Sequence, residues 1–230
     1  MKHLIKTTDL SGLASVNYNR VILNTTTDNV TIDYPYVDLG LPSGLKWAKC
    51  NIGATSETDY GDYFMWGSTT PNTASQCTWS KAPFNNELDS YNEEYFNAHK
   101  SEWLDDNNNL KPKYDAASHI MGGDWRIPTN AEFQELFKYT TKEWTQVNGV
   151  NGYKFTSKKE GFQNNSIFIP AAGYRSDGSV GNVGSSGGVW SSSLYTSGHN
   201  YAWYLGFNSS NCTMGNGNRC YGRSVRGVRK

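Results

Sequence analysis

Charge, cysteine and long apolar runs are all scarce in this chain of 230 residues. Its 21 basic and 21 acidic side chains cancel, and charged residues make up only 18% of the sequence. A chain without excess positive charge has no electrostatic footprint for nucleic acid or an acidic membrane surface, so neither is expected as a partner. No run of 18 apolar residues occurs, which argues against direct membrane insertion.

The sequence also gives little indication of thiol chemistry or of a secretory leader. The sequence contains four cysteines, with no Cys-x-x-Cys pair and no Cys/His spacing typical of zinc sites. An even count permits disulfides, but four residues are few for a chain of this size, and free thiols are favoured. The N-terminus lacks the uninterrupted apolar stretch of a signal peptide, so we expect export by another route or through a segment removed from this sequence.

Glycine and aromatic residues are what the chain has in quantity: 23 Gly, 15 Tyr and 8 Trp. Aromatic side chains each bury much apolar surface, whereas glycine and small polar residues favour turns. The composition therefore predicts a strand-rich, loop-rich fold built around aromatic anchors. The residues expected to be largely buried are Trp47, Trp66, Trp125, Trp190, Trp203 and Phe207.

Two parts can be distinguished along the chain. Residues 1–36 are rich in Thr, Asn and Val and predict an N-terminal strand-rich appendage, with short strands at 19–24 and 29–34. Pro35 marks the boundary. Residues 37–230 form the main domain, which is expected to carry the function.

Secondary-structure signals are uneven in the main domain. Residues 37–48 predict a β-hairpin with a Leu-Pro-Ser-Gly turn, and residues 68–112 predict a long irregular insertion because they are polar and rich in Asn, Ser, Thr and Pro. Residues 115–123 predict a short helix closed by glycine. Residues 166–175 predict a buried strand that runs into a turn. Further strands, separated by Gly- and Asn-rich loops, are predicted from residue 189 onward.

The clearest local signal is a helix start at Thr129. Its hydroxyl can cap the helix, and Glu132 completes a capping box. Phe133, Leu136 and Phe137 then fall on one face of what should be the longest helix of the domain. Two helices among short antiparallel strands and long loops give an α+β fold class.

Residues 202–208 alternate with period two. Trp203, Leu205 and Phe207 are predicted to point inward and Tyr204 outward. The outward positions and flanking loops consist of Tyr, Ser, Asn, Thr, His and Gly, a composition like that of antibody combining sites, in which tyrosine supplies contact area and the small residues supply adaptable hydrogen bonds. An ordinary solvated strand with turn-forming loops is the alternative.

Six phrases follow one another from residue 37 to the C-terminus. They are Val37-Asp-Leu-Gly-Leu-Pro-Ser-Gly-Leu-Lys-Trp-Ala, Tyr60-Gly-Asp-Tyr-Phe-Met-Trp-Gly, Trp125-Arg-Ile-Pro-Thr, Ile169-Pro-Ala-Ala-Gly-Tyr-Arg, Val189-Trp-Ser-Ser-Ser and Gly222-Arg-Ser-Val-Arg. In this order they resemble the major paralogous domain of surface proteins in gut bacteria. The resemblance implies a C-type-lectin-like fold, shared with formylglycine-generating enzymes. Gly227 departs from the family ending, where a proline is expected.

Part of that family resembles the variable proteins of diversity-generating retroelements. There, adenine mutagenesis of a template makes Asn codons near the C-terminus hypervariable, and Lys, Glu, Gln, Met and Trp cannot arise at them. Residues 195–221 contain no Lys, Glu or Gln, and their Trp and Met residues fall at positions expected to be fixed. The resemblance implies that the fixed scaffold positions of this segment are Trp203, Leu205, Phe207, Met214 and Arg219.

The resemblance and the composition together assign the ligand-binding surface to this segment. Tyr201 and Tyr204 are the expected anchors, because binding hot spots are enriched in tyrosine. The residues expected to contact ligand, clustered on one exposed face, are Tyr195, Thr196, Ser197, His199, Asn200, Tyr201, Tyr204, Gly206, Ser209, Ser210, Asn211, Thr213, Asn216, Asn218, Cys220 and Tyr221.

No catalytic constellation is recognisable in the sequence. Formylglycine-generating enzymes use a pair of cysteines near the C-terminus, but the spacing between Cys212 and Cys220 is wider than theirs. The histidines share no helical ligand spacing, Gly-x-Ser-x-Gly is absent, and the acidic pair at 105–106 lacks the alternating carboxylates of a calcium loop. We expect no catalytic residue, no cofactor and no metal-ligating residue, while a structural ion is left open.

The sequence therefore favours a non-enzymatic ligand-binding protein with a hypervariable C-terminal surface, of the phage receptor-binding or bacterial surface adhesin type. The expected location is extracellular, on a phage virion or a bacterial cell surface, and the expected partner is a protein or glycan on another cell. The missing signal peptide favours a phage. A phage fibre would be trimeric, but no heptad repeat supports a trimer, so the oligomeric state stays open. The alternatives are a structural module without a dedicated ligand and a divergent formylglycine-generating-type enzyme.

Overall fold

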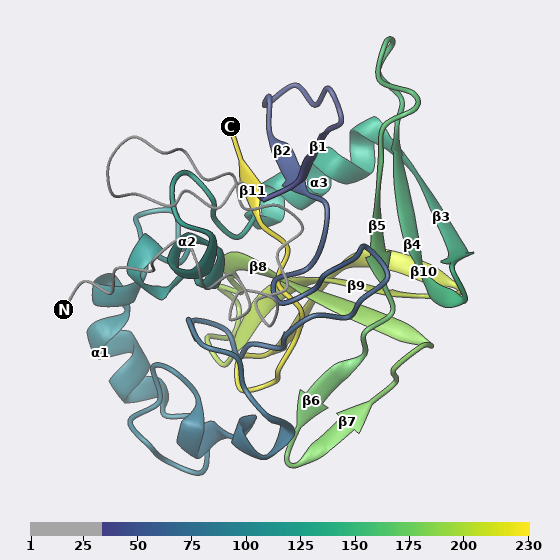
Figure 1. Ribbon diagram of the computed structural model, residues 1–230. Coiled ribbons are helices and arrows are strands. Elements are labelled where there is room, and N and C mark those ends of the chain that lie inside the picture. The colour runs from purple at the N-terminus through teal and green to yellow at the C-terminus, as the bar shows by residue number, and fades with distance from the viewer. Residues whose placement is uncertain (1–33) are drawn as a thin grey trace, which may run out of the picture.

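The computed structural model describes residues 34–230 (Figure 1). These residues form small antiparallel sheets and few helices, which confirms the α+β class. The α-helices in this range number three rather than two: α1 (Glu93–Trp103), α2 (Ala116–Met121) and α3 (Asn130–Tyr139). Short 3-10 turns are η2 (Ala74–Gln76), η3 (Trp79–Lys81) and η4 (Pro112–Tyr114). The strands are β1 (Tyr36–Asp38), β2 (Lys46–Ala48), β3 (Thr140–Val147), β4 (Val150–Ser157), β5 (Ser166–Pro170), β6 (Tyr174–Ser176), β7 (Ser179–Gly181), β8 (Ser186–Leu194), β9 (Tyr201–Asn208), β10 (Asn211–Asn218) and β11 (Val228–Arg229).

The strands build three three-stranded sheets and one two-stranded ribbon. In the β1–β2–β11 sheet, Val37 and Val228 both pair with Trp47, which brings the two ends of the described chain together and confirms the predicted hairpin. β3–β4–β5 and β8–β9–β10 are antiparallel meanders, and β6–β7 is the ribbon. In Figure 1, the β3–β5 sheet stands above the right-hand end of the central β8–β10 sheet, the β6–β7 ribbon lies below the central sheet, and α1 and α2 lie to its left. Residues 1–33 fall outside the described residues, and with them the strand predicted at 19–24 and all but the last residue of the one predicted at 29–34. Of the predicted appendage only residues 34–36 are described, and Tyr36 begins β1.

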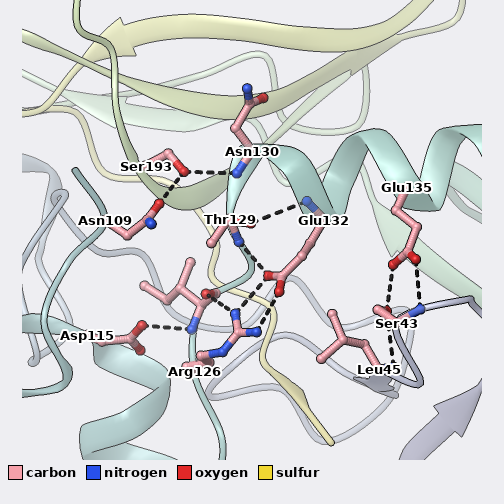
Figure 2. A network of polar contacts seen from close by, with 11 residues as sticks. Ser43, Leu45, Asn109, Asp115, Arg126, Thr129, Asn130, Glu132, Glu135 and Ser193 are labelled. Carbon is pink, nitrogen blue, oxygen red and sulfur yellow. Dashed lines mark hydrogen bonds and ion pairs between the residues drawn. The ribbon is translucent and has the colours of Figure 1, made fainter. Parts of the chain in front are cut away.

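α3 begins where the sequence predicts a helix start (Figure 2). The Thr129 hydroxyl accepts a hydrogen bond from the Glu132 amide (3.3 Å), and the Glu132 carboxylate accepts one from the Thr129 amide (2.8 Å). This reciprocal pair confirms the capping box. Phe133 and Leu136 are fully buried beneath the helix, and Phe137 packs beside them only partly buried.

The prediction that α3 is the longest helix is wrong. α1 has 11 residues and α3 has 10. α1 lies within residues 68–112, which were predicted to be irregular. Asn92 caps it by accepting a hydrogen bond from the Tyr95 amide (3.0 Å), but Phe96 and Trp103 are its only buried side chains. Two buried residues in an otherwise polar helix leave little apolar periodicity, so the sequence carries no clear signal for it.

The central sheet separates two hydrophobic cores. Leu205 and Phe207 of β9 join a core that also contains residues of α3 and β4. Ala202 and Tyr204, which alternate with them, join a second core that contains Trp66 and residues of α1 and α2. Because successive strand residues point to opposite faces, the β8–β10 sheet is packed on both sides.

The expected aromatic anchors are buried, with one exception. Trp203 is only half-buried at the edge of the first core, where its ring lies 5.0 Å from that of Tyr195 between centroids. It is therefore a boundary residue rather than a core residue. The anchors whose burial is confirmed are Trp47, Trp66, Trp125, Trp190 and Phe207.

Candidate ligand-binding site

The register of the β9–β10 hairpin sorts the predicted ligand-contacting residues onto two faces. Tyr204 lies opposite Gly215, whereas Trp203 lies opposite Asn216. Directly paired residues share a face, and neighbours in sequence do not. The pocket face carries Tyr204, Gly206, Asn211, Thr213 and Gly215. The core face carries Trp203, Leu205, Phe207, Met214 and Asn216.

The pocket face is hollowed into a cavity of about 320 Å³, which we call the hairpin pocket. β9 and β10 line it from one side, and residues around the β6–β7 ribbon and the start of β8 line it from the other. Four of the predicted residues line it: Tyr204, Gly206, Asn211 and Thr213. Others that line it were missed in the sequence: Tyr174, Asn182, Ser186 and Arg223.

Arg223 is the least exposed polar residue of the hairpin pocket, with 7% of its surface accessible. Its amide donates to the Phe64 carbonyl (3.0 Å), and its carbonyl accepts from the Phe64 amide (2.9 Å). The next residue, Ser224, donates to the Gly188 carbonyl of β8 (3.2 Å). The backbone is thus fixed on both sides, so the side chain has a defined position against the sheet.

The Arg223 guanidinium is packed among aromatic rings. Its central carbon lies 3.6 Å from the centroid of the Tyr204 ring, 5.2 Å from that of Trp190 and 5.7 Å from that of Tyr174. Burial lowers the pKa of Arg223, and the nearby tyrosines, Tyr204 first, act in the opposite direction. The ion pair found within residues 34–230 joins two other side chains, so no carboxylate balances this charge.

Two glycines make room for this side chain. A Cβ atom at Gly188 would collide with the Nη1 atom of Arg223, and one at Gly217 would lie 2.9 Å from its Nη2 atom. Glycine at these positions is therefore a packing requirement of the guanidinium. From the sequence, the glycines of this region are expected in loops. Gly188 and Gly217 instead lie inside strands, where they leave room for the guanidinium.

The prediction that Tyr204 points outward needs correction. Tyr204 is half-buried, because Trp190 and Arg223 cover its ring on the pocket face. Alternation along β9 correctly separates it from Leu205, but it does not show that both faces are packed. Tyr204 is a wall of the pocket rather than a protruding anchor.

The predicted residues do not form one cluster. Tyr201 and Asn218 are paired on the core face, together with Asn216. Tyr201 and Tyr195 pack together near Trp203, and their ring centroids are 6.3 Å apart. A separate hollow of about 440 Å³ near this edge is lined by Trp203, Thr196 and residues of α3 and its preceding loop. The single exposed face that the sequence predicts is therefore wrong.

The remaining predicted residues lie around the ends of the hairpin. Ser209 and Ser210 are exposed in the β9–β10 turn, and Ser197 is exposed with Thr196 before β9. Tyr221 stacks on Tyr174, a residue that lines the hairpin pocket, with ring centroids 5.6 Å apart, but does not itself line the pocket.

His199 faces α1 rather than the pocket, and the backbone of Asn200 is bonded to the segment after β10. The Nδ1 atom of His199 lies 2.6 Å from the Asn97 side-chain oxygen, and burial lowers the pKa of this histidine. The Asn200 carbonyl accepts a hydrogen bond from the Arg219 amide (3.0 Å). Both residues therefore tie the loop before β9 to neighbouring segments.

Cys220 is wrongly predicted as a contact residue. It is buried in a small core with Met65, Cys77 and Ala82, because the chain turns inward after β10. Cys212 lies in a different core. Burial raises the pKa of each of these two thiols to about 12, which keeps them protonated at neutral pH. All four cysteines are free, as the sequence favours.

The largest of these hollows, about 770 Å³, lies beside the start of α3. Two of the residues that line it, Asp115 and Arg126, are engaged in structural bonds (Figure 2). Asp115 accepts hydrogen bonds from the amides of Ser118 (2.9 Å) and Ile127 (2.8 Å), and Arg126 forms an ion pair with Glu132.

Within the part of the chain that the structure describes, no three His, Cys, Asp or Glu side chains lie close enough together to hold a metal ion. In the same residues, no helix is long and apolar enough to span a membrane.

Residues 145–228 match a family described as Domain of unknown function (DUF8237). The match includes β9, β10 and Arg223 but none of the three α-helices. No curated protein and no solved structure matches the chain.

Proposed function

We propose that this chain is a non-enzymatic ligand-binding protein with a C-type-lectin-like fold, a variable protein of a diversity-generating retroelement within the major paralogous domain family. Displayed on a phage virion or a bacterial surface, it binds a protein or glycan on another cell. The observation that carries this proposal is the hairpin pocket, which the segment expected to vary lines from one side.

The construction of the pocket supports a binding role. Tyr204, Asn211 and Thr213 present neutral hydrogen-bonding and aromatic groups, as small-molecule and paratope surfaces do. The strands that carry them are packed against cores on both faces, so the platform is rigid while its exposed side chains differ in chemistry. Rigid elements position contact residues more accurately than loops.

A pair of matched tryptophan variants tests the proposal. Thr213→Trp places a bulky ring at the hairpin pocket, and Thr141→Trp places the same ring on the exposed face of β3. The labelled full chain is applied to a glycan array and to a panel of bacterial cells. We expect the wild type and Thr141→Trp to bind the same targets and Thr213→Trp to lose them, with similar melting temperatures for all three.

Equal binding by the two variants would place the ligand elsewhere, and failure of the wild type to bind any target would favour a structural module. Sequencing of the flanking DNA tests the diversification part. We expect a reverse transcriptase gene and a second, near-identical copy of the DNA that encodes residues 195–221. Their absence would contradict the retroelement assignment without affecting the pocket.

A further inference from the structure

The C-terminal segment contains three buried arginines, and two of them donate to protein carbonyls. Arg226 donates to the carbonyls of Ala48, Lys49 and Phe168 and to the side chain of Asn51. Arg219 donates to the carbonyls of His199 and Pro83, although its Nη2 atom has no partner among residues 34–230. The side chain of the third, Arg223, donates to no carbonyl in these residues, and its Nε atom is buried and without a hydrogen-bond partner.

Arg223 also lacks a counter-ion. Of the residues that line the hairpin pocket, none is an aspartate or glutamate, so nothing in the wall neutralises the guanidinium. Arg219 and Arg226 have no paired carboxylate among residues 34–230 either, but protein carbonyls accept hydrogen bonds from both. A buried charge without either kind of partner is costly. Because Arg223 alone of the three donates to no carbonyl in these residues, its charge points to an acceptor from outside the chain.

The geometry of the stack indicates the shape of that acceptor. The central carbon of the guanidinium lies over the Tyr204 ring, 3.6 Å from its centroid. A guanidinium carries its N–H groups in a planar fork that matches two oxygens of one oxyanion.

The other residues that line the hairpin pocket indicate the charge of the ligand and the size and polarity of its uncharged part. No lysine, histidine or second arginine lines the hairpin pocket, so the site offers one positive charge and suits one negative charge. Asn182, Asn211 and Thr213 offer neutral donors and acceptors suited to hydroxyl groups. The volume of about 320 Å³ is at the small end for ligand sites and suits a compact ring.

We infer that the hairpin pocket binds an acidic sugar, whose carboxylate or sulfate ester is held by the Arg223 guanidinium and whose hydroxyls contact the Asn- and Thr-rich rim. This inference rests on the proposed function, because it names the ligand class of the same surface. The two anionic groups share one chemistry, a monoanionic oxyanion on a sugar ring, and the experiment separates them.

The experiment titrates the full chain with D-glucuronate and D-glucose, which differ only in a carboxylate against a hydroxymethyl group. D-glucose 6-sulfate tests the sulfate ester, and acetate tests a carboxylate without a ring. We expect one of the two acidic sugars to bind about 10- to 100-fold more tightly than glucose and acetate, as charge-assisted hydrogen bonds imply. Calorimetry gives the affinity, and tryptophan fluorescence reports the location, because Trp190 lies 5.2 Å from the guanidinium.

Three variants assign the effect to the pocket. Arg223→Gln removes the charge at similar length, and Arg223→Lys keeps the charge but loses the fork. Thr213→Trp blocks the pocket without altering Arg223, so it stays informative if the arginine variants do not fold. We expect all three to weaken acidic-sugar binding about tenfold or more. Lys230→Gln, which removes one exposed charge at the C-terminus, should bind like the wild type.

The anion inference is overturned if glucuronate, the sulfate ester and glucose bind alike or not at all, or if Arg223→Gln folds and retains the preference. It is likewise overturned if Lys230→Gln weakens binding as much as Arg223→Gln. These outcomes leave the proposed function standing as long as Thr213→Trp still abolishes cell or array binding. If the preference for acidic sugars is absent and Thr213→Trp also retains cell and array binding, both proposals are contradicted.

Discussion

At the scale of single residues, Arg226 is a buried positive charge with a structural role. Its side chain is fully buried, and it donates to four acceptors in two separate segments, residues 48–51 and Phe168. Burial lowers its pKa to about 10, so it remains charged at neutral pH. The carbonyls it satisfies would otherwise be stranded in the core.

Replacing this arginine tests that role. Arg226→Met keeps most of the apolar bulk and leaves several buried acceptors unsatisfied, each at about 1–3 kcal/mol. We therefore expect the free energy of unfolding to fall by at least about 3 kcal/mol in urea titrations. Lys230→Met, at the exposed C-terminus, should change it by less than about 0.5 kcal/mol. Similar values for the two variants would contradict the structural role.

Asp115 carries a pH dependence. It caps α2, and burial raises the pKa of its carboxyl to about 6 despite two backbone hydrogen bonds that act in the opposite direction. A raised pKa means that the folded state holds the proton more tightly than the unfolded state. The stabilisation is therefore complete below the unfolded value near pH 4 and is lost as the pH rises through about 6.

Asp115→Asn cannot ionise, so it isolates this effect. The stability of the wild type relative to this variant should fall by about 2–3 kcal/mol between pH 4 and pH 7. Urea unfolding at both pH values measures the difference, and NMR titration of the carboxyl measures the pKa directly. Asp124→Asn, at an exposed neighbouring position, controls for the loss of one carboxylate. Parallel pH profiles for the wild type and Asp115→Asn would contradict the raised pKa.

At the scale of elements, helix starts were predictable and a polar helix was not. The capping box of α3 depends on Thr129 and Glu132, which are neighbours in sequence, so a local pattern suffices to find it. α1 is held instead by distant aromatic contacts: Trp103 stacks on Phe84 with ring centroids 4.5 Å apart. A contact made only in the folded chain leaves no periodic signal in the sequence.

The cap of α3 is expected to contribute measurably to the free energy of unfolding. Thr129→Ala removes the hydroxyl that accepts from the Glu132 amide, which should lower the free energy of unfolding by about 1 kcal/mol. Thr70→Ala, the same change at an exposed loop position, should have almost no effect. Chemical denaturation of the two variants measures both values. A cost at Thr129 no larger than that at Thr70 would show that the cap does not stabilise the helix.

At the scale of the whole molecule, the candidate site depends on segments far apart in sequence. Alternation in residues 202–208 correctly placed Leu205 and Phe207 in a core. It could not show that Arg223 returns to cover Tyr204, because that contact requires the chain to pass back beside Phe64 and β8. Strand periodicity predicts which residues share a face; tertiary packing decides whether that face meets solvent.

Packing on both faces also decides which positions of the hairpin can vary. Asn208 is exposed, yet its side chain accepts hydrogen bonds from the amides of Ser210 (2.9 Å) and Asn211 (3.0 Å) and so holds the turn. The exposed positions whose side chains hold nothing comparable are Ser209, Ser210, Asn211 and Thr213. Their counterparts in the core, on the same two strands, are Leu205, Phe207, Cys212 and Met214.

Two libraries, each randomised at four positions, test this difference between exposed and core positions. Randomising Ser209, Ser210, Asn211 and Thr213 together should leave most clones folded, because these side chains contact no core. Randomising Leu205, Phe207, Cys212 and Met214 should leave few, since truncation of a single large core residue costs about 2–5 kcal/mol, a large part of a domain's stability. Cell-surface display followed by protease treatment counts the folded clones in both libraries. Equal fractions of folded clones in the two libraries would mean that the hairpin does not separate a variable surface from a fixed core. Substitutions that line the pocket would then change the fold as well as the binding.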